Sequence, residues 1–95
     1  MQKGYANEFY RIARLLLVRL CNYTCECCHE PASDIQIHHI DCNVDNADPL
    51  NLLVVCKGCH HIIHKGSGTV KIEREVVNDE EFIALRTVWL SLMDV

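Results

Sequence analysis

The sequence predicts a small α+β domain that is held together by bound metal, and three observations support this fold class. The chain has 95 residues, enough for a single domain spanning 1–95 with a thin hydrophobic core. Its 7 Cys and 6 His are the residue types that can staple a domain of this size through a metal ion. Helical periodicity near both ends encloses two short segments with β-strand character.

The composition and the cysteine count exclude several classes of protein. With 49% hydrophobic and 23% charged residues, the chain is not intrinsically disordered. Seven cysteines is an odd number, which fits metal ligation better than a closed disulfide framework. Residues 1–10 are polar and lack the apolar core of a secretory signal, so we expect a cytoplasmic protein with reduced thiols. The longest apolar run, 15–18, is far shorter than the ~20 residues of a membrane span, so we expect no contact with membranes.

Residues 7–21 have the pattern of an amphipathic helix. The predicted buried stripe, at helical spacing, consists of Phe9, Ile12, Ala13, Leu16 and Leu20. Three basic residues lie off that stripe, namely Arg11, Arg14 and Arg19. They are either solvated charges on a surface helix or a face that contacts the phosphates of a nucleic acid.

The middle of the chain alternates loops with short regular elements. Residues 22–31 form a cysteine-rich turn, and alternating β-branched and polar residues over 35–40 predict a strand. Residues 41–50 form a polar loop rich in Asn and Asp. A second short strand is expected over 52–55 and a short helix over 59–65.

The last third of the chain predicts a strand or hairpin arm followed by a helix. Residues 69–77 alternate apolar and charged side chains. Asn78 can cap a helix over 79–93, and Glu81 can reach back to complete the cap. This helix is expected to support the core by burying Phe82, Leu85, Val88, Trp89 and Leu92.

Two Cys-x-x-Cys pairs are the most specific metal signal in the sequence. Cys25 pairs with Cys28, and Cys56 pairs with Cys59. A two-residue gap lets both thiolates of a pair face one ion, and four thiolates close a tetrahedral zinc shell. We therefore predict a structural Zn²⁺; the alternative is that these cysteines are reduced core residues. The remaining cysteines are Cys21, which is expected in the core, and Cys27 and Cys42, which have no predicted role.

The histidines predict a second, open metal site. His60 and His64 lie four residues apart on one face of the short helix, so both can reach a common ion. His38 and His39 end the first strand, where adjacent side chains point to opposite sides. One of them can therefore bind a metal while its neighbour stays free as a base. We predict that His38, His60 and His64 hold this ion, with free positions for water and a substrate oxygen.

Three other polar residues near these groups have simpler interpretations. Asn51 is expected to start the second strand, where it either bridges two backbone segments or is an ordinary turn asparagine. His29 and His61 are expected to be ordinary surface histidines.

Charge is distributed unevenly along the chain. The net charge is +3 over 1–24, −5 over 25–64 and −2 over 65–95, which totals −4. Carboxylates close to the Cys and His cluster suit cation binding. A net negative chain does not wrap nucleic acid with a large basic surface, so any such contact is expected to be weak and made through the N-terminal helix.

The combined pattern resembles that of the HNH endonuclease family. The residues that carry the resemblance are, in order, Cys25-x-x-Cys28, Ile37-His38-His39-Ile40, Asn51-Leu52 and Cys56-x-x-Cys59-His60-x-x-x-His64. They span 25–64, and the two flanking helices lie outside the motif. The resemblance implies the ββα-metal (His-Me finger) fold, in which a two-stranded hairpin and a helix clamp one divalent cation. The four-cysteine zinc site resembles that of phage and restriction-type members.

The resemblance also implies a role for each matching residue. His39 matches the general base, and Asn51 matches the residue that orients the loop and the base. His38 and His64 match ligands of the catalytic cation, and His60 matches a further ligand that only some members use, such as the bacteriocin nucleases. The implied cation is Mg²⁺ or Mn²⁺, and several imidazoles also favour Co²⁺ or Ni²⁺.

The activity implied by the resemblance is hydrolysis of DNA phosphodiester bonds, leaving 5′-phosphate and 3′-hydroxyl ends. One site per chain cuts one strand, so we expect a monomer that nicks duplex DNA, with specificity supplied by a partner protein or low. The alternative is a non-catalytic zinc module that binds DNA or a protein, which explains the cysteines but not the paired histidines. A Cys₂His₂ finger and a thioredoxin-like redox protein both fit the spacing poorly.

Overall fold

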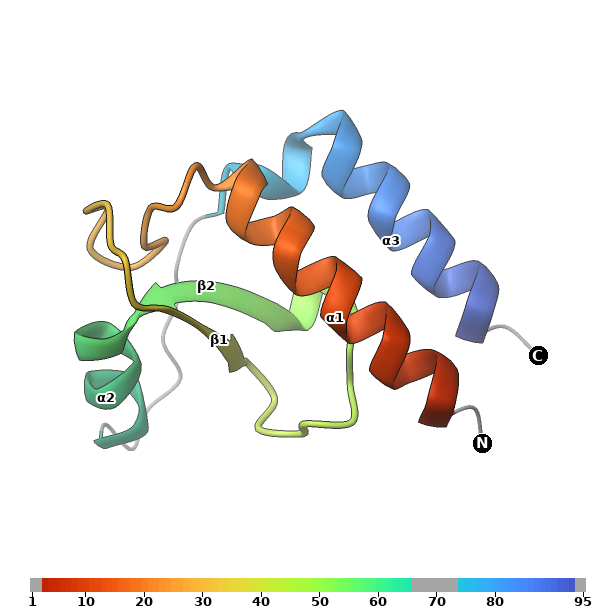
Figure 1. Ribbon diagram of the computed structural model, residues 1–95, viewed down its shortest axis with the longest axis horizontal. Coiled ribbons are helices and arrows are strands. Elements are labelled where there is room, and N and C mark those ends of the chain that lie inside the picture. Colours follow the sequence, from red (N-terminus) through yellow and green to blue (C-terminus); the bar gives the residue numbers. More distant parts are fainter. Residues whose placement is uncertain (1–2, 66–73, 94–95) are drawn as a thin grey trace.

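The structure, a computed structural model, describes residues 3–65 and 74–93. Its helices and strands are α1 (Lys3–Leu20), β1 (Ile35–His39), β2 (Leu52–Cys56), α2 (Lys57–Lys65) and α3 (Glu80–Met93). Two short 3₁₀ helices, η1 (Pro49–Asn51) and η2 (Val76–Asn78), precede β2 and α3. β1 and β2 form an antiparallel two-stranded sheet (Figure 1), so the described residues have the predicted α+β architecture.

The hairpin separates two hydrophobic cores, because adjacent residues of a strand point to opposite faces. Ile37 pairs with Val54, and both side chains face a core shared with α1 and α3. The other buried members of that core are Phe9, Ala13, Leu17, Ala47, Leu52, Phe82 and Leu85. The opposite face carries a smaller core made of Cys25, Leu53, Val55 and Ile63 of α2. Figure 1 shows α1 beside α3, with α2 at the far end of the hairpin.

The buried face of α1 differs from the predicted stripe. Phe9, Ala13 and Leu17 are buried, whereas Ile12 and Leu16 are 52% and 37% exposed. Phe9 and Ala13 are buried as predicted and Leu20 packs on the core, but the prediction was wrong for Ile12 and Leu16. Residues 15–18 are all apolar, so more than one stripe fits the same helical periodicity. The direction of the hairpin and of α3 decides which stripe is buried. The helix also begins at Lys3 rather than at residue 7.

A left-handed turn ends α1 and leads into the cysteine-rich segment. Asn22 and Tyr23 have φ values of 55° and 54°. The Tyr23 amide donates to the Val18 carbonyl over 3.0 Å, which satisfies a carbonyl that the end of a helix leaves free. The chain therefore reverses at this point and brings the first cysteine pair toward β2.

The predicted boundaries need correction at three elements. α2 starts at Lys57, directly after β2, rather than at Cys59, and β1 ends at His39 rather than at Ile40. The predicted strand over 69–77 lies partly outside the described residues. Its end, Val76–Asn78, is a 3₁₀ turn that packs Val76 and Val77 on the first core.

α3 is capped by a different residue from the one predicted. Asp79 Oδ1 accepts a hydrogen bond from the Glu81 amide over 2.8 Å, so Asp79 rather than Asn78 stabilises the helix start. Of the five residues expected to be buried, Phe82 and Leu85 are, Trp89 and Leu92 are half-buried, and Val88 is 53% exposed. Within the described residues, no helix is both long and apolar enough to cross a bilayer.

Candidate functional site

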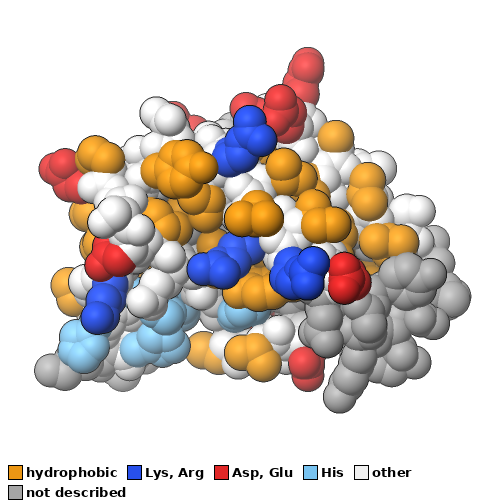
Figure 2. Space-filling model, in the orientation of Figure 1, with side chains coloured by type: hydrophobic (Ala, Val, Ile, Leu, Met, Phe, Trp, Pro, Cys, Tyr) orange, Lys and Arg blue, Asp and Glu red, His pale blue; other side chains and the backbone are white. Residues whose placement is uncertain are grey.

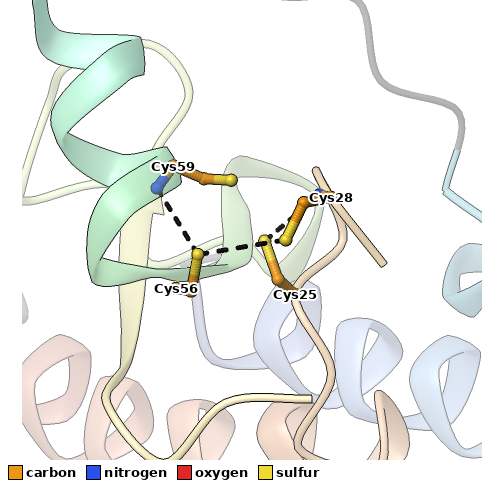
Figure 3. Close-up of side chains that lie close together, drawn as sticks. All are labelled: Cys25, Cys28, Cys56 and Cys59. Carbon is orange, nitrogen blue, oxygen red and sulfur yellow. Dashed lines mark hydrogen bonds between the residues drawn. The ribbon is translucent and has the colours of Figure 1, made fainter. Parts of the chain in front are cut away.

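The two cysteine pairs come together beside the hairpin, as their spacing predicts. Cys25 and Cys28 lie on the turn after α1, Cys56 ends β2, and Cys59 lies in the first turn of α2. Their four Sγ atoms all lie within 4.8 Å of one another, and those of Cys28 and Cys56 are 4.0 Å apart. Figure 3 shows the four sulfur atoms converging. Zn–S bonds of about 2.3 Å in a tetrahedron place sulfurs about 3.8 Å apart, so the group fits a structural zinc.

Backbone amides donate hydrogen bonds to two of the four sulfur atoms, one in each cysteine pair. The amides of Cys27 and Cys28 donate to Cys25 Sγ over 3.3 and 3.4 Å, and the Cys59 amide donates to Cys56 Sγ over 3.4 Å. Burial opposes ionisation of the Cys25 thiol, but backbone hydrogen bonds outweigh burial and lower its pKa to about 7. Burial and the neighbouring thiols raise the pKa of Cys59. Four adjoining sulfurs are therefore not all ionised unless a cation balances their charge.

Three imidazoles form a second group that could hold a metal ion. His38 comes from β1, and His60 and His64 come from one face of α2. One ring nitrogen of each lies within 4.8 Å of the others, and the Nε2 atoms of His60 and His64 are 2.9 Å apart. Metal–nitrogen bonds of about 2.1 Å place adjacent ligands of an octahedral ion about 3.0 Å apart. The geometry therefore fits a transition-metal ion.

Two imidazoles of this group, those of His38 and His60, have lowered pKa values. Burial lowers the pKa of His38, and the fields of His60, His64 and His39 lower it further. Burial, followed by the field of His64, lowers the pKa of His60. A neutral imidazole offers the lone pair that a metal requires, so both residues are ready to act as ligands at neutral pH.

His39 faces the opposite side of the hairpin from His38, as strand alternation predicts. Its ring stacks on Tyr10 of α1, with centroids 5.5 Å apart and planes at 26°. Burial lowers the pKa of His39, and the nearby carboxylate of Asp41 opposes this effect. Its Nε2 atom is buried and has no hydrogen-bond partner. His39 is thus a neutral, oriented imidazole outside the metal group, which are the properties of a general base.

Asn51 bridges two backbone segments and is not a simple turn residue. It is 7% exposed, and its Oδ1 accepts a hydrogen bond from the Asp41 amide over 2.9 Å. Its Nδ2 donates to the Asn46 carbonyl over 3.0 Å. The side chain therefore closes the polar loop 41–50 and holds the segment that follows His39.

The three arginines of α1 lie on the surface. Arg11, Arg14 and Arg19 are all exposed, and Arg11 contacts Glu8 at 3.9 Å. They do not join either candidate metal group. Figure 2 shows basic side chains on the same face of the molecule as histidine side chains.

The other cysteines and histidines stay outside both groups. Cys21 packs against the first core, and burial, with the field of Glu26, raises the pKa of its thiol to about 12. Cys27 is half-buried beside the four-cysteine group, and Cys42 is exposed. His29 and His61 are exposed, as expected.

Three supporting contacts were not predicted. Tyr10 stacks on His39, Gln36 Oε1 lies 2.6 Å from His60 Nδ1, and Arg74 pairs with Glu26 at 2.8 Å. Strand alternation places Gln36 on the face of His38 and could have indicated its proximity to the metal group. The other two contacts join segments far apart in the chain, so no short stretch of the sequence predicts them.

Comparison of the chain with known protein families, with curated proteins and with solved structures finds no match in any of the three. The chain therefore belongs to no family that these comparisons identify. What it does is inferred from the geometry of the two groups.

Proposed function

We propose that the protein is a metal-dependent endonuclease of the HNH type that hydrolyses phosphodiester bonds of DNA. The observation that carries this proposal is the pairing of His38 and His39. One contributes to a three-imidazole group, and its neighbour is a neutral, unligated imidazole held against Tyr10. A structural zinc site explains the cysteines alone, whereas phosphodiester hydrolysis needs both a cation site and a base.

The three imidazoles His38, His60 and His64 would hold the catalytic cation. The spacing of the three rings, and the lowered pKa values of His38 and His60, suit Mn²⁺, Co²⁺ or Ni²⁺ as well as Mg²⁺. When bound, a divalent cation supplies charge neutralisation at the phosphate and at the leaving 3′ oxygen. An open hollow against this group is lined by Asp34, Gln36, Lys57, Gly58, His60, His61 and His64. It gives a phosphodiester room to approach.

His39 would accept the proton of the attacking water. Its Nε2 is buried without a hydrogen-bond partner, so Nδ1 would have to be the nitrogen that meets that water. Stacking on Tyr10 restrains the ring, and Asn51 restrains the backbone just after it. Attack at phosphorus with loss of the 3′ oxygen leaves 5′-phosphate and 3′-hydroxyl ends. The exposed arginines of α1 would bind neighbouring phosphates.

The four cysteines would hold a structural Zn²⁺ that takes no part in the chemistry. Four thiolates leave no position open for substrate. The ion would instead fix the turn after α1 and the start of α2 against β2. His60 follows Cys59 directly, so the zinc site also positions the helix that carries two of the imidazoles.

The test is conversion of supercoiled plasmid to open circle with a panel of divalent ions, combined with a zinc determination. We expect His39→Ala to lose about 10²–10⁴-fold in rate while keeping its fold and its zinc. His29→Asn is the matched control, because His29 is exposed, belongs to neither group and does not line the hollow against the imidazoles, and Asn tolerates its φ of 63°. A His39→Ala protein that nicks DNA like its parent overturns the assignment. A parent inactive with every ion favours the non-catalytic zinc module.

A further inference from the structure

Gln36 connects the hairpin to one of the imidazoles of the proposed metal site. It lies two residues before His38 on β1, so the two side chains share the face that meets α2. Its Oε1 atom is 2.6 Å from Nδ1 of His60, a residue 24 positions further along the chain. Within the described residues this is the one hydrogen bond made by His60 Nδ1.

This contact determines which nitrogen of His60 carries its proton. An amide oxygen only accepts hydrogen bonds, so His60 Nδ1 must donate. In a neutral ring, the Nε2 atom then has a free lone pair. That Nε2 atom lies 2.9 Å from Nε2 of His64 and belongs to the group completed by His38. The hydrogen bond therefore directs a lone pair at the point where the three imidazoles meet.

We propose that Gln36 is a positioning residue that locks His60 in its Nδ1–H tautomer and makes it the third protein ligand of the cation. The inference rests on the proposed function of the His38, His60 and His64 group. Without the Gln36 acceptor, His60 can adopt the other tautomer, whose Nε2–H points at the ion and excludes it. Partners of this kind typically change metal affinity by about 10–100-fold.

The first test is calorimetric titration of Ni²⁺ into the full chain loaded with zinc, so that the cysteine group is already filled. Gln36→Leu removes the acceptor at similar volume, and we expect it to bind Ni²⁺ about 10–100-fold more weakly. Gln36→Glu keeps an acceptor at the same place, and we expect it to bind at least as tightly as the parent. His29→Asn is the control for non-specific binding to an exposed histidine outside both groups.

The second test reads the tautomer directly, by ¹⁵N NMR of the histidine rings in zinc-loaded protein without Ni²⁺. We expect the Nδ1–H form of His60 in the parent and its loss in Gln36→Leu. An Nε2–H form in the parent, unchanged Ni²⁺ affinity in Gln36→Leu, or weakened affinity in Gln36→Glu would each overturn the proposal. Neither readout depends on DNA cleavage. An inactive protein with these properties refutes the nuclease assignment and leaves the role of Gln36 standing.

Discussion

At the scale of single residues, Glu26 and Arg74 form a buried ion pair outside the two candidate metal groups. The Glu26 carboxylate accepts from the Val54 amide over 2.8 Å and from Arg74 Nε over 2.8 Å. The side chains of Glu26 and Arg74 are each 8% exposed. The Arg74 guanidinium also donates to the backbone carbonyls of Pro49, Leu50 and Leu52. This ion pair joins the first cysteine pair, β2 and the segment before α3.

We expect Arg74→Met to lower the free energy of unfolding by about 3–5 kcal/mol, because it leaves the Glu26 carboxylate buried without its partner. The measurement is urea denaturation of the zinc-loaded protein. The double variant Glu26→Gln/Arg74→Met should recover part of the loss, since it removes the buried charge. Arg11→Met is the control, because the Glu8–Arg11 pair is exposed and its loss should leave stability unchanged. An Arg74→Met protein as stable as its parent contradicts this account.

At the level of elements, the junction between β2 and α2 positions residues of both candidate metal groups. β2 runs into α2 without a loop, and Cys56 Sγ accepts the Cys59 amide within the first turn of the helix. The core on this side of the hairpin has four buried members, one of which is Cys25 itself. So small a core gives little stability on its own. We infer that a zinc ion bound by the four cysteines would supply most of the remaining stability of this part of the chain.

We expect Cys56→Ser, or removal of zinc with a chelator, to abolish cooperative thermal unfolding. The substitution weakens a zinc ligand and a helix cap at once, and structural zinc binding is coupled to folding. Circular dichroism melting and a zinc determination measure both effects. Cys42→Ser is the matched control, since Cys42 is exposed and outside the group, and it should keep its zinc and its transition. A zinc-free Cys56→Ser protein that melts cooperatively would disprove the structural role.

For the whole molecule, the proposed function requires a chain with a net charge of −4 to bind DNA, which is itself negatively charged. The arginines of α1 are exposed, and Figure 2 shows basic side chains on a face that also carries histidine side chains. The segment 25–64, with a net charge of −5, contains both candidate metal groups. The negative charge of this segment repels DNA phosphates, and cations bound to the two groups would reduce that repulsion. We therefore expect weak DNA binding that depends on metal and on α1.

We expect replacement of Arg11, Arg14 and Arg19 by alanine to weaken DNA binding and to flatten its salt dependence. Each lost phosphate contact should reduce the slope of log K against log salt by about 0.9. Fluorescence anisotropy with a labelled duplex, in a His39→Ala background that does not cut, measures the slope. The triple lysine variant keeps the charge and should retain most of the slope. A parental slope in the triple alanine variant would show that α1 does not contact DNA.

Much of the candidate site could be predicted because its ligands come in pairs with fixed local spacing. The Cys-x-x-Cys turn and the helical i, i+4 spacing of His60 and His64 each bring two ligand atoms together whatever surrounds them. The fold class and the hairpin could also be predicted from a local pattern, because alternating side chains indicate short strands. The buried stripe of α1 was predicted wrongly, because Ile12 and Leu16 fit helical periodicity as well as Leu17 does. Only the neighbouring elements distinguish them.

The sequence by itself determined the ligand types, their local spacing and the order of the elements, since covalent connectivity sets distances over four or five residues. The tertiary structure alone decided which distant groups support them: Tyr10 against His39, Gln36 against His60, and Arg74 against Glu26. These contacts join α1 to β1, β1 to α2, and the segment before α3 to the turn after α1. They arise from packing the two faces of the hairpin, which depends on the whole chain and is not encoded in any one window.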